Sequence, residues 1–81
     1  MDDTSIHQRI NNLAREEEAL YLQAGREGGL SEDERVRLKD IQVQLDQSYD
    51  LLHQREARRA AGLDPSEASV RPANTVEGYE Q

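Results

Sequence analysis

Apolar residues recur every three or four positions along the first part of the chain, which is the spacing of one face of an α-helix. The row consists of Ile6, Ile10, Leu13, Leu20 and Ala24. Glu17 fills the one polar place in this row. Thr4 or Ser5 can cap the first turn, and Gly25 ends a stretch without glycine or proline. We therefore predict a helix over residues 5–24.

A second helical pattern follows a short glycine-rich break. Ser31 and Glu34 have the spacing of a capping box, in which each side chain accepts a hydrogen bond from the other residue's backbone N–H. The expected inner row is Leu38, Ile41, Leu45, Ser48 and Leu52, and it is widened by Val36, Val43 and Leu51. Gly62 can end the helix in a left-handed conformation. We predict this helix over residues 32–61.

The short connection over residues 25–30 predicts that the two helices run antiparallel. Counting outward from the turn, the expected neighbours are Leu20 and Val36, Glu17 and Lys39, Leu13 and Val43, Ile10 and Asp46, and Ile6 and Asp50. The same count brings Asp2 and Asp3 near residues 53–55, acid against base. Because an unpaired carboxylate in the seam is costly, Glu17 is expected to pair with Lys39 or Arg35.

The tail, residues 63–81, lacks the regular apolar spacing of the two helices. Asp64 followed by Pro65 can start one short helical turn over residues 65–68. Val76 and Tyr79 are unusual choices for a solvated segment, so we predict that the tail docks on the hairpin or on a partner. The expected fold is all-α: an antiparallel two-helix hairpin over residues 1–62 with a coiled-coil-like seam and a mostly irregular tail.

The small size of this hairpin predicts association. A chain of 81 residues usually needs a disulfide, a metal or a partner to become stable. It has no cysteine, and its sequence shows no dense cluster of metal ligands. We therefore expect a homodimer in which two hairpins form a four-helix bundle.

Composition narrows the range of functions. A net charge of −7 with 33% charged residues makes the chain a poor candidate for binding nucleic acid or anionic lipid as a whole molecule. No apolar run approaches the roughly 20 residues of a membrane span. The beginning of the sequence lacks the basic and hydrophobic regions of a secretory signal, and cysteine is absent, so we expect a cytoplasmic protein without a cofactor.

Candidate chemistry is sparse. His7 and His53 should lie at the same end of the hairpin, where a metal site with a nearby carboxylate is conceivable, although two solvated or capping histidines are the simpler interpretation. The acids of residues 16–18 point in three directions about 100° apart and form no carboxylate cluster. The turn glycines do not follow the pattern of a phosphate-binding loop. We expect no enzymatic activity, because two helices offer no pocket for acid–base work.

The strongest candidate for partner binding is the basic end of the second helix, Arg55, Arg58 and Arg59. These arginines could contact a carboxylate-rich protein or a phosphate. The structural alternative is that they compensate the helix dipole and pair with Asp2, Asp3 and the acidic tail. Tyr21, Tyr49 and Tyr79 are best interpreted as packing or interface residues with a polar tip. The possible partner-binding residues are therefore Arg55, Arg58, Arg59, Tyr49, Val76 and Tyr79.

Four motifs cover most of the chain: SIHxRI at residues 5–10, GxLSxxER at 28–35, LDxxxDLLxQRxARR at 45–59 and VRPxxTVExY at 70–79. With them the sequence resembles a family of small actinobacterial proteins grouped as a domain of unknown function. Members of that family often have Trp where this chain has Tyr49. The resemblance implies a stand-alone bacterial cytoplasmic protein, and it implies no activity, substrate or cofactor.

The leading hypothesis is therefore a non-enzymatic interaction or regulatory module that acts as a homodimer and presents its arginine end to another protein. A second hypothesis is a nucleic-acid-associated regulator that uses Arg55, Arg58 and Arg59. A third is a metal-binding protein centred on His7 and His53.

Overall fold

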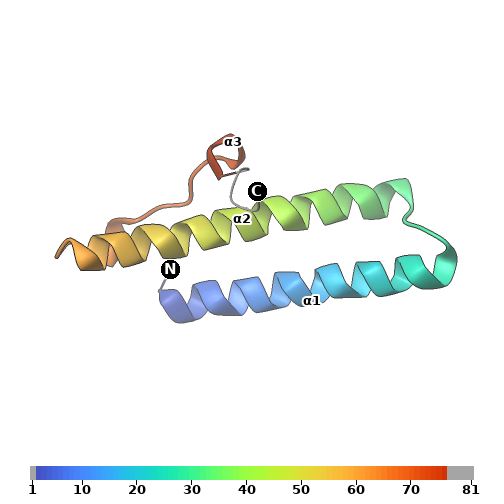
Figure 1. The fold of residues 1–81 in the computed structure, drawn as a ribbon, viewed down its shortest axis with the longest axis horizontal. Helices are drawn as coiled ribbons and strands as arrows, with labels where there is room; N and C mark the ends of the chain where they lie inside the picture. The colour runs from blue at the N-terminus through green and yellow to red at the C-terminus, as the bar shows by residue number, and fades with distance from the viewer. Residues whose placement is uncertain (1, 77–81) are drawn as a thin grey trace.

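The structure, a computed structural model, describes residues 2–76. Two long helices, α1 (Asp3–Glu27) and α2 (Glu32–Ala60), lie side by side and antiparallel (Figure 1). A 3-10 turn, η1 (Pro65–Glu67), and a short helix, α3 (Ala73–Val76), follow on the segment that returns along α2. The predicted all-α hairpin with an irregular tail is confirmed, and residues 2–76 contain no strand.

Helix α1 is longer at both ends than the pattern predicts. It begins at Asp3 because Asp2 is the cap, its Oδ1 accepting the Ser5 N–H at 2.8 Å, so the expectation that Thr4 or Ser5 caps the helix is wrong. It also continues through Gly25 and ends where Gly28 adopts a left-handed φ of 78°. The Gly29 N–H then donates to the Ala24 carbonyl, which closes the last turn. A glycine inside a helix weakens it but does not end it without such a cap.

The two ends of α2 follow the chemistry expected for them. At the start, Ser31 Oγ accepts the Glu34 N–H at 3.2 Å, and Glu34 Oε1 accepts the Ser31 N–H at 2.8 Å, which completes the capping box. At the end, Gly62 has a φ of 74° and donates to the Arg59 carbonyl, while the Leu63 N–H donates to the Arg58 carbonyl. This double closure reverses the chain, so the tail leaves α2 and travels back beside it.

The core lies between the first half of α1 and the middle of α2. Its buried apolar side chains are Ile6, Ile10, Leu13, Ile41, Leu45 and Leu51. Leu20, Leu52 and Ala68 pack against this cluster and are partly buried. The side chains of Ile6 and Ile41 are fully enclosed. The core therefore extends from the middle of the hairpin to the end that is far from the turn, and the tail covers it at that end.

Two details of the expected pairing near the turn are wrong. Val36, which was expected to widen the apolar row opposite Leu20, is 63% exposed and lies outside the core. The carboxylate that crosses the hairpin is that of Glu16, whose two oxygens accept from Arg37 Nε and Nη2 at 2.7 and 2.6 Å, and not that of Glu17. Glu16 and Arg37 lie beside the seam, where both long side chains reach each other and stay in contact with water. A pair at this position avoids the desolvation that Glu17 would suffer inside the seam.

The tail docks on α2 over its described length. Its turn η1 and helix α3 both contact α2. The observed turn at Pro65–Glu67 occupies the place of the helical turn expected at 65–68, with Asp64 as its cap, whereas α3 was not anticipated. Tyr79 lies outside the described residues. No helix in the described part of the chain has the length and apolar character needed to cross a membrane.

Candidate functional site

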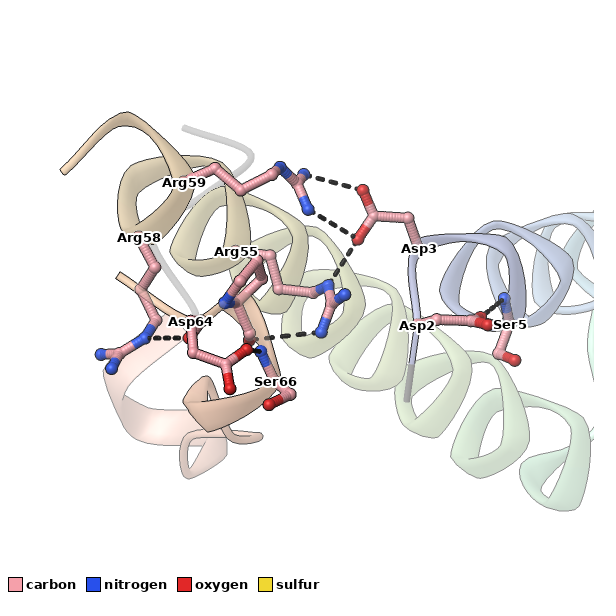
Figure 2. A network of polar contacts seen from close by, with 9 residues as sticks. Asp2, Asp3, Ser5, Arg55, Arg58, Arg59, Asp64 and Ser66 are labelled. Carbon is pink, nitrogen blue, oxygen red and sulfur yellow. Dashed lines mark hydrogen bonds and ion pairs between the residues drawn. The ribbon is translucent and has the colours of Figure 1, made fainter. Parts of the chain in front are cut away.

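The arginine end, defined as Arg55, Arg58 and Arg59, lies in the last turns of α2 (Figure 2). Cations are favourable there because the unpaired carbonyls of a helix C-terminus carry partial negative charge. The arginine end also lies beside the first residues of α1, as the antiparallel arrangement predicts. Each of the three guanidinium groups contacts oxygen atoms of this chain.

Arg55 joins three segments of the molecule. Its Nε donates to Oδ1 of Asp3 at the start of α1, and its Nη1 donates to the carbonyl of Pro65 in the tail at 3.2 Å. Its side chain is only 11% exposed while the tail is in place, so in this arrangement the arginine ties the three segments together. The carboxylate of Asp3 also accepts from Arg59, at 2.7 Å from Nη2 to Oδ2. Hydrogen bonds from Arg55 and then from Arg59 hold the pKa of Asp3 below its usual range.

Arg58 and Arg59 remain more accessible than Arg55. Arg58 donates from Nε to the Asp64 carbonyl at 2.7 Å and from Nη2 to Glu67, and its side chain is 28% exposed. Arg59 is 43% exposed and lies over Asp3. The structural interpretation of these arginines, pairing with an N-terminal acid and with the tail, therefore describes the observed contacts. The Asp2 carboxylate caps α1 and accepts the Ser5 N–H.

A second ion pair is buried under the tail. Asp50 in α2 is fully enclosed, and Arg71 in the tail grips its carboxylate with two donors, Nε at 2.8 Å from Oδ2 and Nη2 at Oδ1. Gln54 Nε2 adds a further hydrogen bond to Oδ2 at 2.8 Å. Such a carboxylate is tolerated only because planar, charged donors meet it with matching geometry. Arg71 is the only base in residues 63–81, and it is used here.

Side chains of α2 also hold the backbone of the tail. Gln54 Nε2 donates to the Ser69 carbonyl at 2.8 Å, and Gln47 Nε2 donates to the Arg71 carbonyl at 3.2 Å. These contacts continue the ones that Arg55 and Arg58 make with Pro65 and Asp64. We call the residues that form this surface, Gln47, Asp50, Gln54, Arg55 and Arg58, the tail-binding face. Four of them are spaced by three or four residues along α2, so they form one stripe.

The opposite flank of the hairpin carries two exposed tyrosines. A flank here is one of the two sides of the plane that contains both helix axes. The side chains that hydrogen-bond across the hairpin, Arg9 with Gln44 and Arg37 with Glu16, lie on the first flank. Tyr21 follows Glu16 by five residues, and Tyr49 follows Gln44 by five. Five residues are about 140° of helix rotation, which carries both tyrosines across the seam to the other flank.

Tyr21 and Tyr49 are 52% and 41% exposed, and Leu38 and Leu52 on the same side of α2 are half-buried. Val70 of the tail shares a water-sized cavity of about 20 Å³ with Arg9 and Gln47, so the tail lies toward the first flank. We therefore call the surface formed by Tyr21, Leu38, Tyr49 and Leu52 the tyrosine flank.

The remaining sequence-derived candidates are placed as follows. His7 is exposed, and His53 lies 4.0 Å from Glu56, one turn further along α2. Within residues 2–76, no three His, Asp or Glu side chains are grouped so that they could hold a metal ion. The side chain of Val76 and all of Tyr79 lie outside the described part of the structure. The candidate surfaces are thus the arginine end, the tail-binding face and the tyrosine flank.

Sequence reasoning missed the buried pair of Asp50 and Arg71. A signal for it was present: the expected register set Asp50 opposite Ile6, inside the seam, where an acid needs a partner. The tail contains four acids and a single base, Arg71, which is therefore the candidate partner for Asp50 in that segment. The observed pair of Glu16 and Arg37 differs from the expected pair of Glu17 with Lys39 or Arg35 by one position on α1 and by two on α2, because rotation about the helix axes moves the long side chains out of the seam.

Comparison with known proteins adds the following findings. Residues 2–81 match the family described as "Protein of unknown function (DUF2630)". An uncharacterized protein of Mycobacterium tuberculosis is 50% identical over 78 residues, which are 95% of this chain and 88% of the relative. An uncharacterized protein of Mycobacterium bovis matches with the same identity and the same coverage. No solved structure matches the chain.

These matches confirm the resemblance found in the sequence, and the structure gives its motifs a physical meaning. Asp50, Gln54, Arg55 and Arg58 all belong to the motif at residues 45–59, and Arg71 belongs to the motif at residues 70–79. Residues of the first of these motifs, on α2, therefore bind the tail segment that contains the second motif.

Proposed function

We propose that this chain, which belongs to the DUF2630 family of proteins of unknown function over residues 2–81, is a non-enzymatic protein-interaction module that works as a homodimer. The tyrosine flank of one copy would pack against that of a second copy, and the two hairpins would form a four-helix bundle. The highly charged, cysteine-free composition favours the cytoplasm as its compartment.

The observation that carries this proposal is the exposure of Tyr21 and Tyr49 beside half-buried leucines on one flank. Tyrosine is favoured at interfaces because it buries a large apolar ring and can keep its hydroxyl in a hydrogen bond. Leu38 and Leu52 would provide the apolar neighbours that a tyrosine needs to become a strong contact. An apolar face that is half-covered within one chain is completed by a symmetric copy of itself.

The total accessible surface supports the same conclusion. The chain exposes 5532 Å², whereas about 4,900 Å² is usual for a monomeric protein of this mass. Its dimensions of 51 × 24 × 18 Å show why, since a rod encloses less interior than a sphere. Two such rods that pack along their length would recover part of the missing burial.

The test is the mass of the protein in solution. We expect light scattering at micromolar concentration to give about twice the chain mass of 9.2 kDa. Replacing both tyrosines, Tyr21→Lys with Tyr49→Lys, should return the mass of a single chain while the helical circular dichroism persists. The matched control is Val36→Lys, because Val36 is also exposed but lies outside the tyrosine flank. A wild-type protein that stays monomeric across a hundredfold range of concentration would overturn the proposal.

A further inference from the structure

The tail-binding face holds a peptide mainly through that peptide's backbone. Gln47, Gln54, Arg55 and Arg58 each donate a side-chain hydrogen bond to a carbonyl, and the four carbonyls belong to Arg71, Ser69, Pro65 and Asp64. The carbonyls of Asp64 and Pro65 belong to the turn η1, and those of Ser69 and Arg71 belong to the irregular segment after it. These four donors therefore select a short helical turn followed by an open backbone, and they tolerate many sequences. Main-chain hydrogen bonds play the same role in peptide-binding domains that add an extended ligand.

Sequence preference comes from Asp50. Its carboxylate is enclosed, and within the described part of the tail the Arg71 guanidinium reaches it with two nitrogens. A planar fork of N–H groups matches both carboxylate oxygens, whereas an ammonium group can approach only as a point charge. A neutral residue in place of Arg71 would leave a buried charge without its strongest partner. The face therefore distinguishes arginine from all other residues at one position.

Pro72 prepares the segment for this contact. The residue before a proline is biased toward an extended backbone, so Arg71 is set in the conformation in which its side chain and its carbonyl both point at α2. Proline also has no N–H, so the segment carries no backbone donor at that position that would need a partner. An Arg-Pro pair is thus the recognisable chemical feature of the ligand.

The apolar part of the tail contact is small, which makes the tail replaceable. Leu63 and Val70 remain 54% and 59% exposed, and Ala68 is the tail residue that packs against the core. A segment held mainly by exposed polar bonds opens at a lower free energy than one held by buried apolar surface. The helices carry their own core, so they can keep their packing while the tail is away.

We propose that the tail-binding face is a recognition site for a segment of a partner protein in which a short helical turn is followed by an Arg-Pro pair, and that residues 63–73 occupy it as a displaceable internal ligand. This site lies apart from the tyrosine flank and does not depend on dimer formation. The tethered tail acts as a competitor at an effective concentration near the millimolar range. Only a partner that adds contacts beyond those of the tail would displace it, so the tail sets a threshold for binding.

The experiment measures binding of a synthetic, fluorescently labelled peptide with the sequence of residues 63–74 to the full chain by fluorescence anisotropy. One receptor is the wild-type chain and the other is the full-length Arg71→Gln chain, whose own tail lacks the guanidinium. We expect the peptide to bind the Arg71→Gln chain at least about tenfold more tightly than the wild-type chain. The Arg71→Gln peptide should bind at least tenfold more weakly than the native peptide, and the Arg71→Lys peptide should also lose affinity.

Two controls tie the preference to Asp50. A Glu67→Gln peptide loses only a contact at a 67%-exposed side chain, so its affinity should stay within about threefold of the native peptide. When Asp50→Asn is added to the Arg71→Gln chain, the native and Arg71→Gln peptides should bind within about threefold of each other. Equal binding of these two peptides to the receptor that retains Asp50 would overturn the proposal, as would no gain of affinity over the wild-type chain.

A second arm needs no variant of the receptor. A spin-labelled native peptide at millimolar concentration should broaden the side-chain amide signals of Gln47 and Gln54 in the ¹⁵N-labelled wild-type chain, and the Arg71→Gln peptide should not. Identical spectra with both peptides would overturn the proposal even if the Arg71→Gln chain failed to fold. A monomeric mass in light scattering would contradict the homodimer alone, so the two proposals fail separately.

Discussion

The two halves of the hairpin are built from the same two helices but are stabilised in different ways. The half away from the turn contains the buried side chains of Ile6, Ile10 and Leu51 and is covered by the tail. The half near the turn contains exposed Leu22 and Val36 and is bridged by the water-exposed pair of Glu16 and Arg37. A third segment thus separates an enclosed half from an open one (Figure 1).

The difference teaches what a tail contributes to a two-helix protein. Two helices can enclose only the stripe between them, so any residue off that stripe faces water. Where the tail adds a third side, α2 can bury an acid such as Asp50, because the tail supplies the matching arginine. Near the turn, where no described segment adds a third side, the chain relies on helix caps and exposed charges.

The largest expected effect tests the enclosed half against the open one. Ile6→Ala removes a fully buried side chain and should lower the free energy of unfolding by about 3 kcal/mol, because it leaves a cavity in the core. Val36→Ala, at a side chain that is 63% exposed near the turn, should change it by less than about 0.5 kcal/mol. Urea unfolding followed by circular dichroism at 222 nm measures both. Equal losses would show that the two halves do not differ in burial.

The next effect compares two arginines that each grip a carboxylate with two donors. Arg71→Ala should destabilise the protein by roughly 2 kcal/mol, less than a fully buried pair would lose, because Arg71 itself is 44% exposed while Asp50 is enclosed. Arg37→Ala breaks a pair in which both side chains are 44% exposed, and its effect on the melting temperature should be much smaller. Thermal melts of both variants at low and moderate salt compare the two losses of melting temperature. A larger loss for Arg37→Ala would reverse the comparison.

The sequence predicted the fold correctly, and in each half it predicted some contacts and missed others. Periodicity places Ile6, Ile10 and Leu13 in the core because burial on a helix follows rotation angle. It predicts the Ser31 capping box because that signal is local. It does not predict the contact between Asp50 and Arg71, because residues 21 positions apart meet only after the chain reverses at Gly62.

The same reasoning applies to the arginine end. Arg55 was a possible partner-binding residue, with pairing to the N-terminal acids and the tail as the structural alternative. It is enclosed, because Asp3 comes from one side and the Pro65 carbonyl from the other. Neither neighbour can be identified from the spacing of residues in α2 alone. The tyrosine flank needed the rotation of both helices, together with the position of the tail, before it could be defined.

A smaller effect concerns two glycines at the turn end of α1. Gly28→Ala should cost about 1 kcal/mol, because its φ of 78° is strained for a residue with a Cβ, even though no atom lies within 4 Å of that Cβ. Gly25→Ala, inside the helix and equally free of contacts, should stabilise by about 0.5–1 kcal/mol. Urea midpoints of the two variants should therefore move in opposite directions. Movement in the same direction would contradict the observed end of α1 at Gly28.

The smallest expected effect is the response of the two halves to acid. Hydrogen bonds from Arg55 and Arg59 lower the pKa of Asp3 below 3.8, and those from Arg37 lower the pKa of Glu16 below 4.5. A lowered pKa stabilises the fold above the ordinary value, and this contribution is lost as the pH falls through the folded value. The melting-temperature gap between wild type and Asp3→Asn should persist at neutral pH and close below about pH 3.8. The gap for Glu16→Gln should start to close at a higher pH, and a gap that stays constant in either variant would show that its carboxylate makes no such ion pair.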